Sequence, residues 1–569
     1  MKKLPLGISN YEDIVKENRI YVDKTKYIEK LEDFPNKTIM FLRPRKFGKT
    51  LFTSTLECYY DKNRKDSFKE LFENTYIGKN PTENRNKYCV LRFNFSGIST
   101  ENLEETIKGF RNKVATSVEL FVSKYGLDFI INQDDEAEMI LNNLFKAFLI
   151  QKAYEKIYVI IDEYDHFANE LLGFKTEDFK NLVAKNGKIR KWYEILKEGT
   201  ETVVDRIFIT GVAPITLDST TSGFNIASDI TKNIFFYDML GFSKNDVEYL
   251  MDELNINKEK QKELLPIIKT NYDGYVFSTM IKDNIENYKL YNSNMTLYFL
   301  SMYQLQNEIP KELVDINIIS DYSKIEAFMD LCQNMNKIDI LEKVVAGEPI
   351  ESSLTEKFNA EIEFGEKELI SLLFYLGYLT IKEIGFSKYK FQIPNDVIKQ
   401  IYSNYFLEYI SRKANIVVDS IDTESINAEL LLEGKIDRLL NVLKEFLTNL
   451  SNRDYARFDE KYVKVIFYSI CRMLGTVYVK SELEVGGKYA DILLLPKEEI
   501  KERYGILIEF KYIKQEDYDK DNSILIQKQI QAKEQIENYK NTEEIKMIPK
   551  LKSYSIVVIK DRIEITEIN

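Results

Sequence analysis

Eight residues near the amino terminus have the types and the spacing that bind a nucleotide phosphate. Arg43 to Thr50 read R-P-R-K-F-G-K-T, directly after an apolar run at 38–42. We expect a strand, a loop and then a helix that starts near Lys49, because the free N–H groups at a helix N-terminus meet an anion. Lys49, preceded by Gly48, would reach the β- and γ-phosphates, and Thr50 would hold Mg²⁺. Arg43 stands where the pattern G-x-x-x-x-G-K-[ST] has glycine, and a bare Gly-Lys-Thr also occurs by chance.

Two further segments supply what such a loop needs from neighbouring strands. Residues 156–167 read K-I-Y-V-I-I-D-E-Y-D-H-F, a short apolar run that ends in two carboxylates. Asp162 would hold Mg²⁺ through water, and Glu163 would orient or deprotonate the attacking water. A third run, 206–210, ends in Thr210, and we expect this strand between the other two, with Thr210 sensing the γ-phosphate. The alternative is a set of ordinary α/β core strands capped by acidic turns.

A different group of side chains, far along the chain, has the composition of a phosphodiester-hydrolysing site. Glu509 and Lys511 are two residues apart on a predicted strand, so they share a face, and Asp491 lies on the strand before it. Two carboxylates around Mg²⁺, with a lysine to position or activate water, suffice for this chemistry. Glu482 and Glu460 are further candidate ligands. The alternative is an edge strand with a cross-strand salt bridge.

The chain has one histidine, His166, and this limits the chemistry that it can do. A Ser-His-Asp triad and a multi-histidine metal site are excluded. Hydrolysis must therefore rest on carboxylates, lysines and metal ions. His166, beside Asp165, is either part of a site or a surface residue in the loop after a strand.

The elements that must position the second group follow a recognisable order. An amphipathic helix is expected at 458–474, strands at 477–485, 489–495 and 506–511, a helix at 524–539 and a strand at 554–559. This α-β-β-β-α-β order places the carboxylates and the lysine on adjacent central strands. It makes a nuclease fold a more specific prediction than the pattern of three residues alone.

The length of 569 residues predicts three or four domains. We divide the chain into a nucleotide-binding core at 1–235, a helical lid-like bundle at 236–330, a helical region at 331–450 and the α-β-β-β-α-β domain at 455–569. The third region contains a helix and a two-strand ribbon, which predicts either a winged-helix-like module or a packing spacer.

Composition sets the cellular context that we expect. The net charge of −12 argues against a broadly basic nucleic-acid-binding surface, but basic and acidic side chains balance between Tyr455 and Asn569. No apolar stretch is long enough to span a bilayer, and the start of the chain lacks the apolar core of a signal peptide. Four scattered cysteines without a C-x-x-C pair indicate a reduced, cytoplasmic protein without structural zinc.

With these motifs in place, the chain resembles predicted AAA-ATPase-like proteins that carry a C-terminal PD-(D/E)XK nuclease-like domain. Matching motifs run nearly end to end: L-P-L-G-I at 4–8, Y-V-D-K-T at 21–25, R-P-R-K-F-G-K-T at 43–50, T-G-V-A-P-I at 210–215, Y-D-G-Y at 272–275, G-Y-L-T at 377–380, I-P-N at 393–395, A-D-I at 490–492, E-F-K at 509–511, and Gln535 with Tyr539. The family's own loop begins R-P-R, so Arg43 is a family trait.

The resemblance implies a P-loop NTPase of the ASCE/AAA-like class with a parallel sheet, a helical middle and a restriction-endonuclease-like C-terminal domain. It implies ATP binding through Lys49 and Thr50, an Asp162-Glu163 pair, and nuclease residues Asp491, Glu509 and Lys511. One position departs from the family. Many members read G-R-x-D before the first metal carboxylate, and here Tyr489 holds the arginine's place, with Lys488 before it.

We therefore expect an ATP-binding and ATP-hydrolysing protein coupled to a Mg²⁺-dependent nuclease that acts on DNA. The alternative is a nucleotide-dependent switch that binds partners and keeps an inactive nuclease fold. Arg43, Arg45 and Arg206 are candidates to contact phosphate or to act across a subunit interface in a homo-oligomer. No membrane partner is expected.

Overall fold

The computed structural model describes residues 2–167, 187–215, 226–310, 312–314, 337–358, 364–450, 459–485, 488–497 and 503–568. Contacts divide the chain into two compact units. Unit 1 contains 1–335 and 349–397, and unit 2 contains 336–348 and 398–569. The block expected at 331–450 is divided between the two units, and the division into four blocks stays a prediction.

The core of unit 1 is a five-stranded sheet with the order β2-β3-β4-β1-β5. Its strands are β1 (Thr38–Leu42), β2 (Cys89–Asn94), β3 (Ile157–Asp162), β4 (Val204–Gly211) and β5 (Ser228–Asp229), and every pair is parallel. All six residues of β3 are buried, as expected of a parallel strand covered on both faces. β4 lies between β1 and β3, which confirms the predicted strand order.

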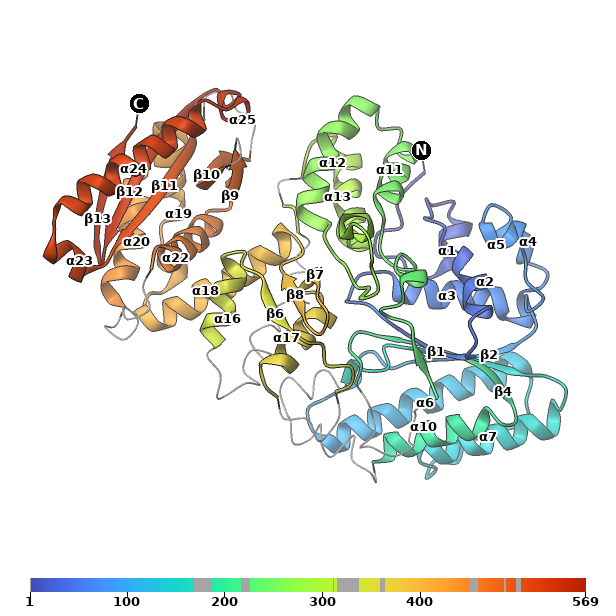
Figure 1. Cartoon of the computed structure of the whole chain (residues 1–569). Coiled ribbons are helices and arrows are strands. Elements are labelled where there is room, and N and C mark those ends of the chain that lie inside the picture. Colours follow the sequence, from blue (N-terminus) through green and yellow to red (C-terminus); the bar gives the residue numbers. More distant parts are fainter. Residues whose placement is uncertain are drawn as a thin grey trace. The chain divides into compact units, whose positions relative to one another are not determined.

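Helices cover both faces of this sheet (Figure 1). α3 (Lys49–Tyr60), α1 (Tyr11–Lys16) and α2 (Lys26–Glu32) lie on one side, and α6 (Leu103–Tyr125), α7 (Ala137–Gln151) and α10 (Lys188–Gly199) on the other. Trp192 of α10 packs against Phe93, Phe95 and Phe110 and is fully buried. Two short helices, α4 (Phe68–Phe72) and α5 (Tyr76–Lys79), precede β2.

The rest of unit 1 holds a helical group and a small sheet. The helices are α11 (Lys244–Glu253), α12 (Lys258–Tyr272) and α13 (Ser293–Gln306). The sheet has the order β6-β8-β7, from β6 (Ile350–Ser352), β8 (Tyr389–Gln392) and β7 (Thr380–Ile384), and α17 (Glu366–Tyr375) precedes β7. The expected helix and two-strand ribbon are present, and β6 adds a third strand. We call 366–392 the helix-ribbon module.

Unit 2 is built on a mixed sheet with the order β13-β12-β11-β10-β9. Its strands are β9 (Val477–Val485), β10 (Lys488–Pro496), β11 (Gly505–Ile513), β12 (Leu551–Ile559) and β13 (Arg562–Glu567), with β11 and β12 parallel and the other pairs antiparallel. The predicted α-β-β-β-α-β order is confirmed. β13 was not predicted.

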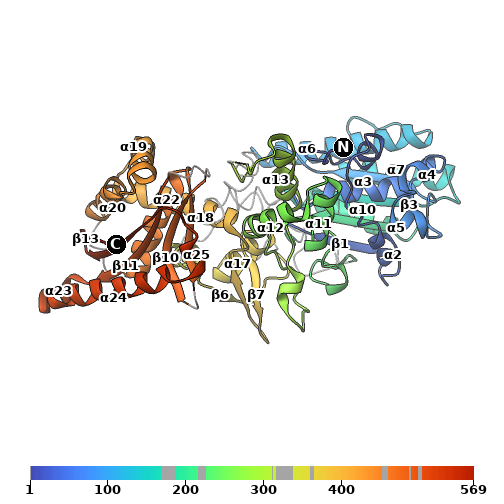
Figure 2. The same cartoon turned by 90° about the horizontal axis from the view of Figure 1, so that it is seen from above.

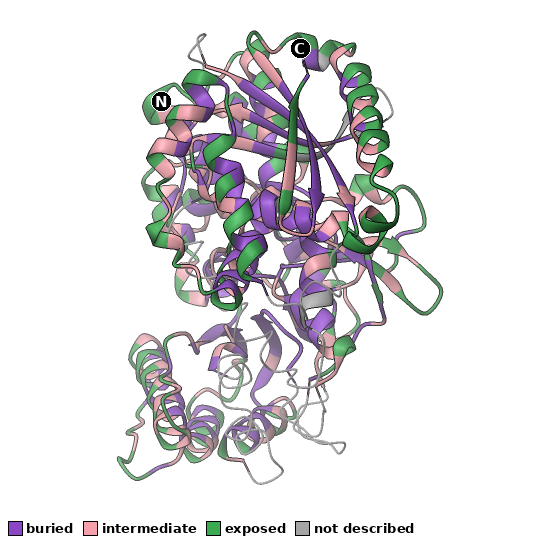
Figure 3. Cartoon of the chain, turned by 90° about the vertical axis from the view of Figure 1, so that its left-hand side faces the viewer, coloured by how far each residue is buried: buried purple, intermediate pink, exposed green. Residues whose placement is uncertain are grey.

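Helices flank this second sheet (Figure 2). α22 (Glu460–Met473) packs against Phe510 through Phe467, and α24 (Ser523–Lys540) packs against Leu507 on the other face through Ile536. The central strands β11 and β12 are mostly buried, the edge strand β13 is partly or fully exposed, and the helices expose their outer faces (Figure 3). The unit also contains α16 (Lys337–Val345), α18 (Asp396–Ala414), α19 (Thr423–Ala428), α20 (Asp437–Asn449), α23 (Gln515–Lys520) and α25 (Glu543–Lys546). In the part of the chain that the structure describes, we find no helix with the length and apolarity of a membrane span.

Candidate functional sites

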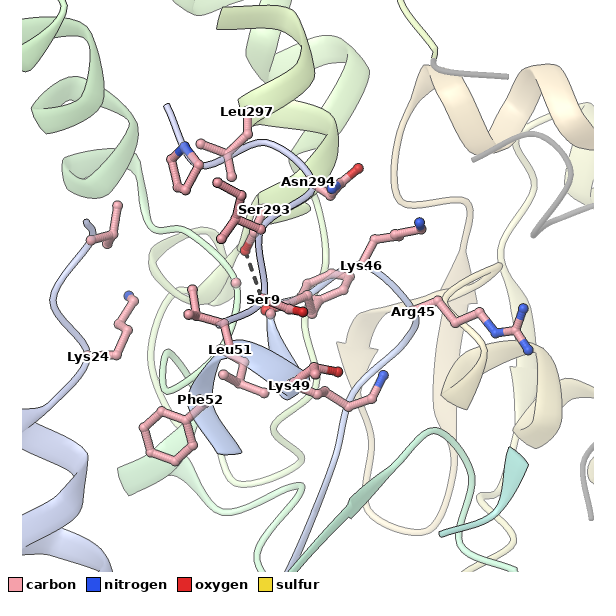
Figure 4. A pocket seen from close by; sticks show the side chains of 18 of the residues that line it. Ser9, Lys24, Arg45, Lys46, Lys49, Leu51, Phe52, Ser293, Asn294 and Leu297 are labelled. Carbon is pink, nitrogen blue, oxygen red and sulfur yellow. Dashed lines mark hydrogen bonds between the residues drawn. The ribbon is translucent and has the colours of Figure 1, made fainter. Parts of the chain in front are cut away.

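A cavity of about 540 Å³ lies over the loop that joins β1 to α3 (Figure 4). Arg45, Lys46 and Lys49 of that loop line it, with residues from the N-terminal segment and from α13. Lys24 of the N-terminal segment also lines the cavity and forms a 2.7 Å ion pair with Asp246 of α11. Residues from several separate stretches of unit 1 therefore enclose the cavity around one cationic loop.

The loop itself has the backbone of an anion-binding turn. Gly48 precedes the first turn of α3 with φ +93°, a left-handed conformation that favours glycine. Lys49 is 4% exposed, and its Nζ donates hydrogen bonds to the carbonyl oxygens of Arg43 and Pro44, both at 3.1 Å. It also lies 3.6 Å from Glu163 Oε1. The lysine is thus held over the loop, beside the helix N-terminus.

Asp162, at the end of β3, is fully buried beside this loop. Its Oδ2 accepts a hydrogen bond from Thr53 Oγ1 at 3.4 Å and lies 3.5 Å from Arg92 Nη2. Burial and the adjacent Glu163 raise the pKa of Asp162. Within the described residues Asp162 Oδ1 has no hydrogen-bond partner. A buried carboxylate oxygen of this kind fits a bound cation or its water.

Glu163 follows with φ +54°, a strained backbone for a residue other than glycine. Burial raises the pKa of Glu163, but the charges of Lys49, His166 and Arg45 outweigh it and hold the pKa below its ordinary value. His166 Nδ1 lies 4.0 Å from Glu163 and 3.4 Å from Arg45 Nη2. Both Glu163 and His166 line the cavity. The sequence left open whether His166 is part of a site or a surface residue. The sequence feature that indicated a place in the site was its position just after a strand that ends in two carboxylates.

Arg43, Thr210 and Arg206 are not among the residues that line this cavity, and their expected contacts with the nucleotide stay predictions. Arg43 is 1% exposed, and its guanidinium donates to the carbonyl oxygens of Leu42, Thr231 and Tyr237 at 2.9–3.0 Å. Burial lowers its pKa to about 9. Thr210 is buried and donates to the Phe41 carbonyl oxygen at 2.8 Å. Arg206 lies in the first half of β4, whereas the nucleotide-binding loop follows the carboxyl end of the parallel strand β1. Arg206 and the loop are therefore at opposite ends of the sheet.

Two side chains of the nucleotide-binding loop, Pro44 and Phe47, pack against the helix-ribbon module and against the segment 275–277. Phe47 packs edge-on against Tyr275 and Phe277, at centroid distances of 5.0 and 5.5 Å. Gly377 has φ +83°, and a Cβ there would lie 2.8 Å from the Pro44 side chain. Thr380 Oγ1 accepts the Val276 N–H at 2.8 Å. The motifs at 272–275 and 377–380 thus support the loop that carries Lys49.

In unit 2, Asp491 lies where the pairing of β10 and β11 stops. The last paired residues are Ile492 and Ile508, and one position earlier Asp491 Oδ2 accepts the Phe510 N–H at 2.8 Å. Asp491 Oδ1 forms a 2.6 Å ion pair with Lys464 of α22. Burial lowers the pKa of Lys464, but Asp491 and Glu460 outweigh it and raise the pKa above its usual value. Lys464 was not predicted, because its spacing on α22 has no motif.

Glu509 and Lys511 converge as the sequence predicted. Lys511 Nζ donates to Glu509 Oε1 at 2.8 Å, and both side chains are at least nine-tenths buried. Burial and Asp491 raise the pKa of Glu509 to about 7, against the opposing effect of Lys511. Within the described residues Glu509 Oε2 has no hydrogen-bond partner. Burial and Glu509 raise the pKa of Tyr539 on α24 to about 12.

These residues fit a magnesium ion through two carboxylates, with carbonyl oxygens and water completing the ligands. In the described part of the chain, no three histidine, cysteine or acidic side chains are gathered as a metal-binding group. Glu482 lies on β9, but its side chain is outside the described residues, as are the side chains of Lys488 and Tyr489. A role for Glu482 in metal binding therefore stays a prediction.

Comparison with known proteins finds one family model in each of the two units. Residues 5–221 match the family model described as "Predicted AAA-ATPase", and residues 458–568 match that of the "PD-(D/E)XK nuclease superfamily". A protein of Azotobacter chroococcum mcd 1, described as "Uncharacterized protein in vnfD 5'region", is 24% identical over 495 residues, which is 83% of each chain. That description assigns no activity.

Proposed function

We propose that this chain, which joins a predicted AAA-ATPase domain to a PD-(D/E)XK nuclease-superfamily domain, hydrolyses ATP and thereby controls a Mg²⁺-dependent nuclease that acts on DNA. The observation that carries the proposal is shared by the two sites. Each has a buried carboxylate oxygen without a hydrogen-bond partner among the described residues, Asp162 Oδ1 and Glu509 Oε2, near a buried lysine. An unpaired buried carboxylate oxygen is costly unless a cation or water completes it.

In the ATPase domain, the proposed roles follow the positions of the side chains. Lys49 is placed to bind phosphate, and Thr50 and Asp162 would hold the magnesium ion. Glu163, whose pKa stays below its ordinary value, is ionised at neutral pH and is placed to accept a proton from water. Arg45 and His166 border the same cavity and would bind or orient the phosphate end of the nucleotide. Bound Mg²⁺-ATP supplies the phosphoryl group and the charge that neutralises it.

In the nuclease domain, Asp491 and Glu509 would hold Mg²⁺, and Lys511 is placed to position or activate the attacking water. Bound Mg²⁺ supplies the Lewis acid for an in-line displacement at phosphorus. Lys511 Nζ donates to Glu509 Oε1 at 2.8 Å, so the lysine is held in the site without a bound substrate.

The polypeptide chain itself connects the nucleotide-binding loop's surroundings to the nuclease unit, and this connection could couple the two activities. The nucleotide-binding loop packs against Tyr275, Phe277 and the helix-ribbon module through Phe47 and Pro44. The module ends at β8 and leads into α18, a single helix that begins at Asp396 in unit 1 and continues in unit 2 from Ile398. A shift of the loop on ATP binding would therefore reach the chain segment that enters the nuclease unit. We propose this route as the basis of control.

The alternative is a nucleotide-dependent switch whose nuclease fold serves as a binding module. The observation that favours it is the ion pair of Lys464 with Asp491, which occupies one oxygen of a predicted metal ligand. We also propose a cytoplasmic protein, since Cys58, Cys89 and Cys471 are free and buried. A homo-oligomer that supplies a second arginine to the ATP cavity, where Arg45 is the arginine of this chain, is a further proposal.

A cleavage assay separates the two candidate functions. The full chain is incubated with Mg²⁺ and linear DNA, supercoiled DNA or RNA, and compared with Asp491→Ala and Lys511→Ala. Lys552→Ala is the matched control, because Lys552 lies on β12 of the same sheet and pairs with Glu567 instead of a site residue. We expect DNA cleavage by the wild type and the control, and none by the two site variants or in EDTA. Equal activity of all four proteins on every substrate would remove the nuclease proposal.

A further inference from the structure

A lysine of α22 lies between two acidic side chains of the nuclease unit. Lys464 Nζ is 2.6 Å from Asp491 Oδ1 and 2.8 Å from Glu460 Oε1. The three residues line a cavity of about 430 Å³, and the Lys464 side chain is 27% exposed. Ions in solution can therefore reach this position.

Both carboxylates are oriented by the backbone of β11. Asp491 Oδ2 accepts the Phe510 N–H at 2.8 Å, and Glu460 Oε2 accepts the Tyr512 N–H at 3.3 Å. Each carboxylate therefore turns its other oxygen toward the same point, which the Lys464 ammonium occupies. Two carboxylate oxygens that face one point, completed by water, are ligands that a hard divalent cation takes.

The charges of the cluster point the same way. When all three carboxyl groups are ionised, Glu460, Asp491 and Glu509 carry three negative charges, and Lys464 and Lys511 carry two positive charges within 2.8 Å of them. One net negative charge remains for a divalent cation to meet. Without Lys464, the Glu460–Asp491 pair would offer two uncompensated negative charges beside the Asp491–Glu509 pair, as a two-metal site does.

We propose that the Lys464 ammonium takes the place of one of the two divalent cations of a two-metal nuclease site, so that this nuclease unit binds one divalent cation. The inference rests on the proposed nuclease function, because Asp491 and Glu509 must hold that ion. The fixed ammonium neutralises Glu460 and Asp491 at every metal concentration. An ammonium group is not a Lewis acid and does not lower the pKa of a bound water, as a metal ion does. Activation of the attacking water therefore depends on the single ion and on Lys511.

The test is the number of Mn²⁺ ions that the nucleotide-free full chain binds, measured by electron paramagnetic resonance or calorimetry. Ions that Asp491→Ala loses are assigned to the nuclease site. We expect one such ion in the wild type and in Lys464→Arg, which keeps the charge, and two in Lys464→Met. Lys461→Met is the matched control. Lys461 lines the same cavity with a 30% exposed side chain but pairs with Glu348, so its variant should still bind one ion.

Two results would overturn the inference and leave the nuclease proposal standing, and a third would remove both. Two Asp491-dependent ions in the wild type would show that Lys464 replaces none. One ion in both the wild type and Lys464→Met, bound more tightly by the variant, would show that Lys464 only competes for Asp491. No Asp491-dependent ion in any protein would remove the metal site itself, and the nuclease proposal with it. Circular dichroism of each variant confirms that the count is taken on folded protein.

Discussion

The Lys49→Met variant tests the ATP site through its most buried cation. Lys49 Nζ donates to two carbonyl oxygens at 3.1 Å and lies 3.6 Å from Glu163 Oε1. When phosphate binds, the ammonium exchanges neutral acceptors for charged ones. A hydrogen bond to a charged group contributes ~1.5–3 kcal/mol, so two of them contribute ~3–6 kcal/mol. Since ~1.4 kcal/mol is tenfold in affinity, the Kd for ATP should rise by on the order of 10²–10⁴.

The same variant should stay folded. It loses two hydrogen bonds to neutral carbonyl oxygens, each of which contributes ~1 kcal/mol net, against a domain stability of ~5–15 kcal/mol. Thermal denaturation without nucleotide measures this loss. Calorimetric titration with Mg²⁺ and a non-hydrolysable ATP analogue measures the affinity.

Lys46→Met is the matched control, because Lys46 belongs to the same loop and lines the same cavity. It is more exposed than Lys49, so its charge should contribute ~1 kcal/mol or less, which is about fivefold. If Lys49→Met binds the analogue as tightly as the wild type, or if Lys46→Met loses as much affinity, the assignment of the phosphate-binding lysine is wrong.

Three further predictions follow from particular side chains. Glu163→Gln should slow ATP turnover by ~10²–10⁴-fold, the range for a lost general base, and spare ATP binding; steady-state turnover and calorimetry would contradict the role if both stayed at the wild-type level. Gly211→Ala should destabilise unit 1 by at least ~1–3 kcal/mol in denaturant unfolding, because its Cβ would lie 2.2 Å from Asp165 Oδ1 and 2.5 Å from the Tyr164 ring; wild-type stability would show that this turn tolerates a side chain. In EDTA, unit 2 should lose stability as the pH rises from about 4.5 to about 7, since folding raises the pKa of Glu509 and the folded state holds a proton that the unfolded state releases; the same pH dependence in Glu509→Gln would assign it to another group.

Much of the fold could be predicted because its strands are short apolar runs that end in polar residues. The bounds of β1 and β9 agree with the predicted runs, and β3 ends at Asp162 as expected. The site on β11 was predictable because two residues on one strand share a face whatever the rest of the fold does. Local pattern thus sufficed wherever the chemistry depends on neighbours in sequence.

Prediction failed where a side chain depends on partners far along the chain. Arg43 belongs to the phosphate-binding motif, yet its guanidinium meets carbonyl oxygens of Thr231 and Tyr237, and no spacing rule connects these positions. Lys464 contacts Asp491 from another element for the same reason. The edge strand β13 was missed because its residues 562–567 are partly or fully exposed and carry little apolar signal.

The central claim is that ATP controls the nuclease, and the rate of DNA cleavage with and without ATP tests it most directly. The account predicts that Mg²⁺-dependent cleavage by the wild type changes when ATP is added. It also predicts that Lys49→Met, at an ATP concentration that saturates the wild type but not the variant, loses this response, while Lys46→Met keeps it. Cleavage at one rate with and without ATP in the wild type would contradict the account, as would an ATP response that persists in Lys49→Met.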